Sequence, residues 1–94
     1  MDIQTLSRIK SKFVARQVSD ELVIVPLSGN VAQMNELFTL NETGKFIWEN
    51  ATESNTTESL TALMTDAFDI DNQTAKRDIE TFLTQMDILT KYNN

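Results

Sequence analysis

Residues 40–49 mark the point at which the character of the sequence changes: Leu40-Asn41-Glu42-Thr43-Gly44-Lys45-Phe46-Ile47-Trp48-Glu49. Before this stretch apolar residues recur with a period of about two, and after it with a period of about 3.6. Asn41 is a favoured type of N-cap, and Glu42 follows it in the first turn, where the helix dipole favours an anion. We therefore expect a strand to end here and a helix to run from Asn41 to about Asn50, with Ile47 and Trp48 facing inward.

The residues before this junction predict a small sheet. Two β-branched runs, Phe13 to Val18 and Leu22 to Val25, are separated by Ser19-Asp20-Glu21, which is the pattern of a hairpin. Pro26 ends the second run because a residue without an amide hydrogen does not fit a central ladder. A third short strand is expected over Leu37 to Leu40.

The residues after the junction predict two more helices. The first opens at Thr56 or Thr57 and ends near Asp69, and the second starts at Asp71. Their apolar stripes recur at helical spacing: Leu60, Leu63, Met64, Ala67 and Phe68, then Ala75, Ile79, Phe82, Leu83 and Met86. The tail from Leu89 to Tyr92 is expected to add a short strand or to fray. The fold class is therefore α+β, with three strands followed by three helices.

Length and charge describe a single acidic domain. The 94 residues suffice for one core, with residues 12–92 folded and residues 1–11 expected to form a flexible basic arm. Residues 1–16 hold four bases and one acid, a net charge of +3, whereas residues 17–94 hold four bases and 13 acids, a net charge of −9. Such a body repels polyanions, which argues against a nucleic-acid partner.

Several residue types that chemistry needs are absent from the sequence. Without Cys or His there is no disulfide, no thiolate nucleophile and no common general base, so we expect neither an enzyme nor a metal site or cofactor. Asp69, Asp71 and Glu80 have the spacing of a calcium loop, but Thr74 occupies the position that requires Gly. The sequence shows neither a secretory signal nor a transmembrane stretch, so we expect a cytoplasmic protein without a membrane partner.

The junction also carries a family resemblance. Leu40-Asn41-Glu42-Thr43-Gly44, followed by Ile47-Trp48-Glu49, resembles the hallmark segment of the PqqD family, named for pyrroloquinoline-quinone biosynthesis. This family overlaps with the recognition elements of ribosomally made, post-translationally modified peptides. The resemblance extends roughly from Phe13 to Leu89. It implies a winged-helix-like fold, a three-stranded antiparallel sheet followed by a three-helix bundle.

The resemblance also implies a function. In that family the leader of a precursor peptide docks as an extra strand on the third strand, in a groove walled by the third helix. The domain presents the leader to a modifying enzyme, often a radical-SAM protein, and does no chemistry itself. The expected partners are therefore a precursor peptide and such an enzyme, with the domain a monomer or a weak homodimer.

The residues support such a groove but leave alternatives open. An edge strand over Leu37, Phe38, Thr39 and Leu40 is uncharged and free of Pro, so a partner strand can pair with it unless the loop from Val31 to Glu36 caps it. On the third helix Lys76, Glu80, Leu83 and Asp87 form a polar strip whose apolar border is Leu83. These four residues and Ile79 of the buried stripe are the candidate peptide-binding residues. Ile79 and Leu83 are expected to line the groove while Lys76 selects acidic leader residues. The alternative is that Leu83 is ordinary core and Lys76 ordinary surface.

Two other functions compete with peptide binding. A winged helix can bind DNA as a regulator, but the third helix from Asp71 to Asp87 carries four acids and two bases, a net charge of −2. The other possibility is a structural accessory subunit that only helps its partner enzyme to assemble. Such a subunit differs from the adaptor because it has no affinity for any leader alone.

Overall fold

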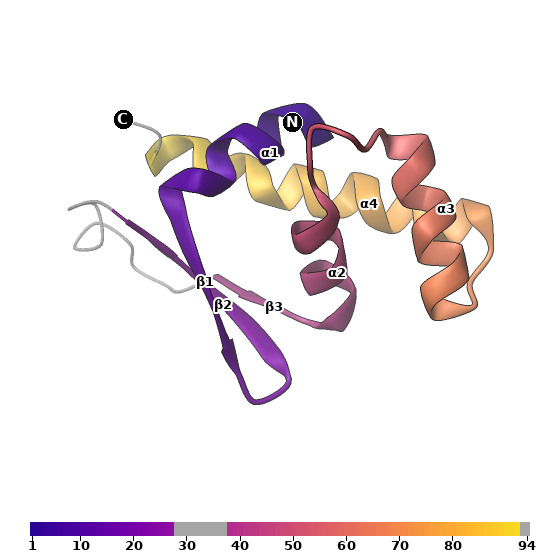
Figure 1. Ribbon diagram of the computed structural model, residues 1–94, viewed down its shortest axis with the longest axis horizontal. Coiled ribbons are helices and arrows are strands. Elements are labelled where there is room, and N and C mark those ends of the chain that lie inside the picture. Colours follow the sequence, from indigo (N-terminus) through magenta and orange to yellow (C-terminus); the bar gives the residue numbers. More distant parts are fainter. Residues whose placement is uncertain (28–37, 93–94) are drawn as a thin grey trace.

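The computed structural model describes residues 1–27 and 38–92 and places three strands before three helices, as predicted (Figure 1). In chain order the elements are α1 (Ile3–Ile9), η1 (Lys10–Lys12), β1 (Phe13–Val18), β2 (Glu21–Pro26), β3 (Phe38–Leu40), α2 (Glu42–Asn50), α3 (Thr57–Phe68), α4 (Asn72–Met86) and η3 (Asp87–Tyr92). The fold is α+β and winged-helix-like, with one additional helix at the N-terminus.

The three strands form an antiparallel sheet in the order β1-β2-β3. Leu22 and Ile24 of β2 face the helices and are buried, and Leu22 pairs with the buried Leu40 of β3. In β1 only Phe13 is buried, and the rest of the strand is exposed. The hairpin therefore extends away from the helices, and its free end lies at the bottom of Figure 1.

The helices start where their caps are expected. The side chain of Asn41 caps α2, that of Asp71 caps α4, and Thr56 forms a capping box with Ser59 at the start of α3. The predicted apolar stripe of α4 is confirmed, since all five of its residues are buried. Because Asp71 serves as an N-cap, its carboxylate already accepts a hydrogen bond from the backbone amide of Thr74 at 2.7 Å.

The predicted stripe of α3 is only partly buried. Leu60 and Met64 are buried and Phe68 packs edge-to-face on Phe46 with 5.2 Å between ring centroids, but Leu63 and Ala67 are exposed. The prediction that these last two residues face the core is wrong. A short helix at the end of the molecule packs along one line of residues four apart, whereas the helical wheel allows a wider stripe.

The N-terminal segment differs from the expected flexible arm. Asp2 caps a helix, α1, whose residues Ile3, Leu6 and Ile9 are all buried. Spacings of three place these side chains on one face of α1, and that face packs beside α4. The basic residues alone suggested a solvated arm, but the apolar residues of the same segment belong to the core.

The C-terminal tail also differs from the expected strand or frayed end. Residues Asp87 to Tyr92 form the 3₁₀ helix η3, which continues from α4. Leu89 is fully buried, so this segment is held by the core. None of the helices in the part of the chain that the structure describes is long and apolar enough to cross a membrane.

Candidate functional site

The site is built where β3 ends, α2 begins and α4 passes beside them. The Oδ1 of Asn41 accepts a hydrogen bond from the backbone amide of Gly44 at 2.9 Å, which fixes the first turn of α2. A Cβ atom at Gly44 would lie 3.2 Å from Cε1 of Phe82 and 3.3 Å from Cβ of Leu40. Gly44 is therefore needed because α4 and β3 approach it closely, not for a special backbone conformation.

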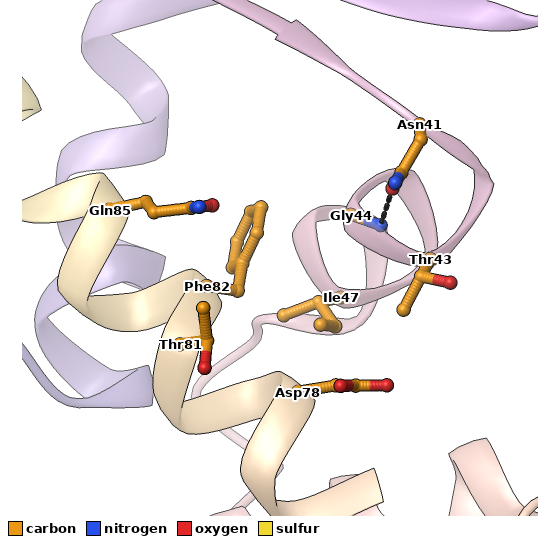
Figure 2. A pocket seen from close by; sticks show the side chains of 8 residues that line it. All are labelled: Asn41, Thr43, Gly44, Ile47, Asp78, Thr81, Phe82 and Gln85. Carbon is orange, nitrogen blue, oxygen red and sulfur yellow. Dashed lines mark hydrogen bonds between the residues drawn. The ribbon is translucent and has the colours of Figure 1, made fainter. Parts of the chain in front are cut away.

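A hollow of about 250 Å³ lies between α2 and α4 at this junction (Figure 2). Its lining residues are Asn41, Thr43, Gly44 and Ile47 from the start of α2, and Asp78, Thr81, Phe82 and Gln85 from α4. Figure 2 shows the Asp78 side chain extending from α4 toward α2, and the Phe82 ring standing between Gln85 and Gly44. Asp78 carries the one charge among these lining residues.

The outer edge of β3 is the second component of the site. β3 pairs with β2 on one side only, and within residues 1–27 and 38–92 no strand pairs with its other side. Such an edge presents backbone amide and carbonyl groups to a partner. Figure 2 shows β3 reaching Asn41 above the hollow, so the edge and the hollow meet at this residue.

The structure separates the residues that the sequence proposed on α4. Ile79 is fully buried in the core, and Leu83 is buried as well. Lys76 is exposed and lines a different cavity, between α3 and α4. Glu80 and Leu83 line a third cavity with Met1 and Asp2, on the side of α4 that faces the N-terminus.

Asp87 belongs to the same side as Glu80 and Leu83. One of its carboxylate oxygens, Oδ1, lies 2.6 Å from the amino group of Met1. Neither the four proposed residues of α4 nor Asp87, which follows it, lines the hollow beside β3. The proposed strip therefore lies on roughly the opposite side of the helix from Asp78, Thr81 and Gln85, given about 100° of rotation per residue.

The proposed residues of β3 are placed as a strand. Phe38 is half-buried and packs against the core, Thr39 is exposed and Leu40 is buried. Leu37 and the loop from Val31 to Glu36 lie outside the described residues. Contact between β3 and a peptide stays a prediction. We expect the backbone of the outer edge of β3 to make this contact, because the side chain of Leu40 is buried.

Sequence reasoning missed Asp78, Thr81, Phe82 and Gln85 as a set. Their spacing of three, four and seven residues from Asp78 puts them on one face of α4. The signal that pointed to them was Gly44, since a glycine within a helix costs about 1 kcal/mol and suggests close approach by another element. That element is α4, and the residue that makes the approach is Phe82.

Comparison with known protein families shows to which family the chain belongs. The family model described as "Coenzyme PQQ synthesis protein D (PqqD)" matches residues 21–87. The chain belongs to the PqqD family. This match runs from the start of β2 into the first residue of η3, so it contains both the outer edge of β3 and every residue that lines the hollow.

A solved structure shares the fold of this chain. It is described as "TbiB1 in Complex with the TbiA(beta) Leader Peptide", with a TM-score of 0.66 and 24% sequence identity. The similarity covers 84% of this chain and 86% of that chain, so the two proteins share their architecture over nearly their full lengths. No curated protein shows a significant match to this member of the PqqD family.

Proposed function

We propose that this protein is a non-catalytic adaptor that binds the leader of a ribosomally synthesised precursor peptide. The leader adds as a fourth strand to the outer edge of β3, next to α4. The single observation that carries the proposal is the outer edge of β3, which pairs with no strand in the part of the chain that the structure describes and which leads to the hollow at Asn41. Membership of the PqqD family supports it, and so does the shared fold with a protein whose structure contains a leader peptide.

The energetics of strand addition suit such a role. Main-chain hydrogen bonds supply affinity whatever the sequence of the partner, and side-chain pockets beside the edge supply specificity. Micromolar binding corresponds to about −8 kcal/mol. A short added strand and one or two filled pockets are sufficient for this affinity, and the edge beside the hollow offers both components.

The proposal assigns the chemistry to a partner. The protein contains no His and no Cys, so the commonest general base and the thiolate nucleophile are missing. A peptide-modifying enzyme, of the radical-SAM type by family resemblance, therefore carries out the reaction. A cytoplasmic location for this pair stays a prediction of the sequence.

Titration with leader peptides tests the proposal. Short open reading frames beside this gene supply the candidates, and amide shifts of the ¹⁵N-labelled protein map where each peptide binds. We expect shifts at Phe38 to Leu40 and along α4, with micromolar affinity by calorimetry. If no candidate peptide binds the isolated protein, the adaptor proposal fails and the structural accessory subunit takes its place.

Backbone methylation distinguishes strand addition from other modes of binding. An added strand points alternate amide groups at the edge that it joins, so only every second peptide N–H is bonded to β3. Methylating the amides of one alternate set should abolish binding, while methylating the other set should leave it almost unchanged. Equal losses from both sets would show that the peptide does not bind as a strand.

A further inference from the structure

The charge inside the hollow is a half-buried carboxylate for which the described residues provide no partner. Asp78 lines the hollow between α2 and α4 and is shielded from solvent on part of its surface. Among the described residues its side chain takes part in no hydrogen bond and no ion pair, whereas the carboxylates of Asp2 and Asp71 accept backbone amides and that of Asp87 contacts an amino group. Asp78 is therefore available to a ligand.

The groups around Asp78 are neutral hydrogen-bonding side chains. Thr43, Thr81 and Gln85 line the hollow, and none of them forms a side-chain hydrogen bond with another described residue. The contrast with Thr84 on the same helix is direct, because its hydroxyl donates to the carbonyl of Glu80 at 3.0 Å. The hydroxyls and the amide in the hollow are free to bond with a guest.

Phe82 and Ile47 complete the hollow with apolar surface. Phe82 is held against Gly44, and Ile47 is buried beneath it. A carboxylate beside neutral hydrogen-bonding groups suits a cation, because the carboxylate attracts positive charge directly while the hydroxyls and the amide oxygen can accept hydrogen bonds from it. The stem of a long basic side chain can lie along these apolar atoms with its charged end at Asp78.

We propose that this hollow receives a lysine or arginine side chain of the bound leader and that Asp78 selects it. The inference rests on the proposed function and gives the leader a chemical requirement. It reverses the expectation that Lys76 selects acidic leader residues, because Lys76 lies at another cavity. At about 250 Å³ the hollow is smaller than the roughly 300–1,000 Å³ typical of drug-sized ligands, so it suits one side chain rather than a separate small molecule.

Selection from a random displayed peptide library tests this requirement. The full-length protein is used as bait, and the Asp78→Asn and Glu80→Gln variants are used in parallel. Both substitutions remove one negative charge from α4, but Glu80 lies at the cavity next to Met1 and Asp2. We expect the wild-type protein and Glu80→Gln to enrich peptides with Lys or Arg at one fixed position, and Asp78→Asn to lose that enrichment.

Individual peptides then measure the preference. Replacing the enriched basic residue by norleucine should weaken binding to the wild-type protein at least tenfold, and to Asp78→Asn by less than threefold. Asp78→Lys should prefer Glu at the same position. Thermal denaturation of each variant shows that it is folded before it is used.

The outcomes separate this inference from the proposed function. Peptides that bind at β3 without any basic preference, or a preference that Asp78→Asn retains, would overturn the inference and leave the adaptor function intact. A library that returns no peptide binding at β3 would overturn both. Amide shifts at Gly44, Asp78 and Gln85 on adding an enriched peptide, absent with its norleucine analogue, would support the inference.

Discussion

Phe82 lies against Gly44 so closely that no side chain at position 44 can be added without a shift. A Cβ atom there would meet the Phe82 ring at 3.2 Å, Cβ of Leu40 at 3.3 Å and Oδ1 of Asn41 at 3.4 Å. These contacts come from three elements, the end of β3, the cap of α2 and the middle of α4. The pair therefore fixes how the sheet edge, the helix and the hollow are placed relative to one another.

A double-mutant cycle tests the Gly44 contact. Alanine is favoured over glycine within a helix by about 1 kcal/mol, but here the added methyl group is too close to Leu40 and Phe82. We expect Gly44→Ala to lower the free energy of unfolding by about 1 kcal/mol. In a Phe82→Leu background the same change should be neutral or stabilising, with a coupling energy of about 1 kcal/mol or more by urea denaturation. Strictly additive effects would contradict the contact.

Lys10 holds the C-terminal end of α2. Its Nζ donates to the carbonyl of Trp48 at 2.6 Å and to that of Ala51 at 3.3 Å, and it lies 5.7 Å from the centroid of the Trp48 ring. Lys10→Met keeps the apolar stem but leaves these carbonyls without their donor. We expect a loss of about 1.5–3 kcal/mol in the free energy of unfolding, as for hydrogen bonds to charged groups. The exposed Lys12→Met is the matched control, expected to change stability by less than about 0.5 kcal/mol.

The packing of α1 predicts that the N-terminal segment contributes to stability. Leu6 is fully buried, so Leu6→Ala should cost about 2–5 kcal/mol through lost contacts and the cavity left behind. The neighbouring Arg8 is exposed, and Arg8→Ala should change stability by less than about 0.5 kcal/mol. Urea denaturation of both variants measures the difference. If both substitutions changed the free energy of unfolding by equally small amounts, the N-terminal segment would be a flexible arm after all.

Much of the fold could be predicted because local signals agree with tertiary packing. Asn41 and Asp71 cap the helices that they were expected to cap, and the valine-rich runs form the hairpin. The N-terminal helix was missed because the cluster of bases that includes Arg8 and Lys10 suggested a solvated arm. Its apolar residues, Ile3, Leu6 and Ile9, pack against a core formed by residues that come later in the chain, so the local pattern does not show their partners.

The candidate site was harder to predict, and the missed helix is the reason. The buried stripe of α4 has two borders, one carrying Glu80 and Leu83 and the other Asp78 and Gln85. Periodicity identifies both borders but does not say which of them faces the sheet. The first border forms the groove wall only if it faces the open edge of the sheet, and a flexible arm over residues 1–11 would leave it uncovered. In the structure the N-terminal residues lie at that border.

The N-cap of α4 predicts a dependence of stability on pH. Hydrogen bonds from Thr74, through its side chain and its backbone amide, lower the pKa of the Asp71 carboxyl. A carboxyl whose pKa is lower in the folded state stabilises the protein above its unfolded pKa of about 3.9, and this contribution is lost as the pH falls through the folded pKa. Asp71→Asn keeps a capping oxygen but does not titrate.

Thermal denaturation across the acid range measures this effect. The wild-type protein should have a higher Tm than Asp71→Asn near neutral pH, and the difference should vanish as the pH falls below the folded pKa of Asp71, where this carboxyl is protonated in both states. A difference that does not change with pH would show that the Asp71 carboxylate is not stabilised by its hydrogen bonds to Thr74.

The same substitution on the two sides of α4 should weaken peptide binding on one side and leave it unchanged on the other. Thr81 lines the hollow beside β3, whereas Thr84 lines the cavity next to Met1 and Asp2. Both residues are exposed, so tyrosine can be placed at either position without disturbing the core. Thr81→Tyr fills the hollow and should weaken binding of a leader peptide at least tenfold, or about 1.4 kcal/mol, because the guest side chain loses its space.

Thr84→Tyr is the matched control and should bind the same peptide with wild-type affinity, as measured by calorimetry on variants of equal Tm. If Thr84→Tyr weakened binding while Thr81→Tyr did not, the peptide would lie along the border that carries Glu80 and Leu83, as the sequence alone suggested. The hollow between α2 and α4 would then have no role in recognition. Because both variants replace threonine by tyrosine, comparing them shows which face of α4 contacts the peptide.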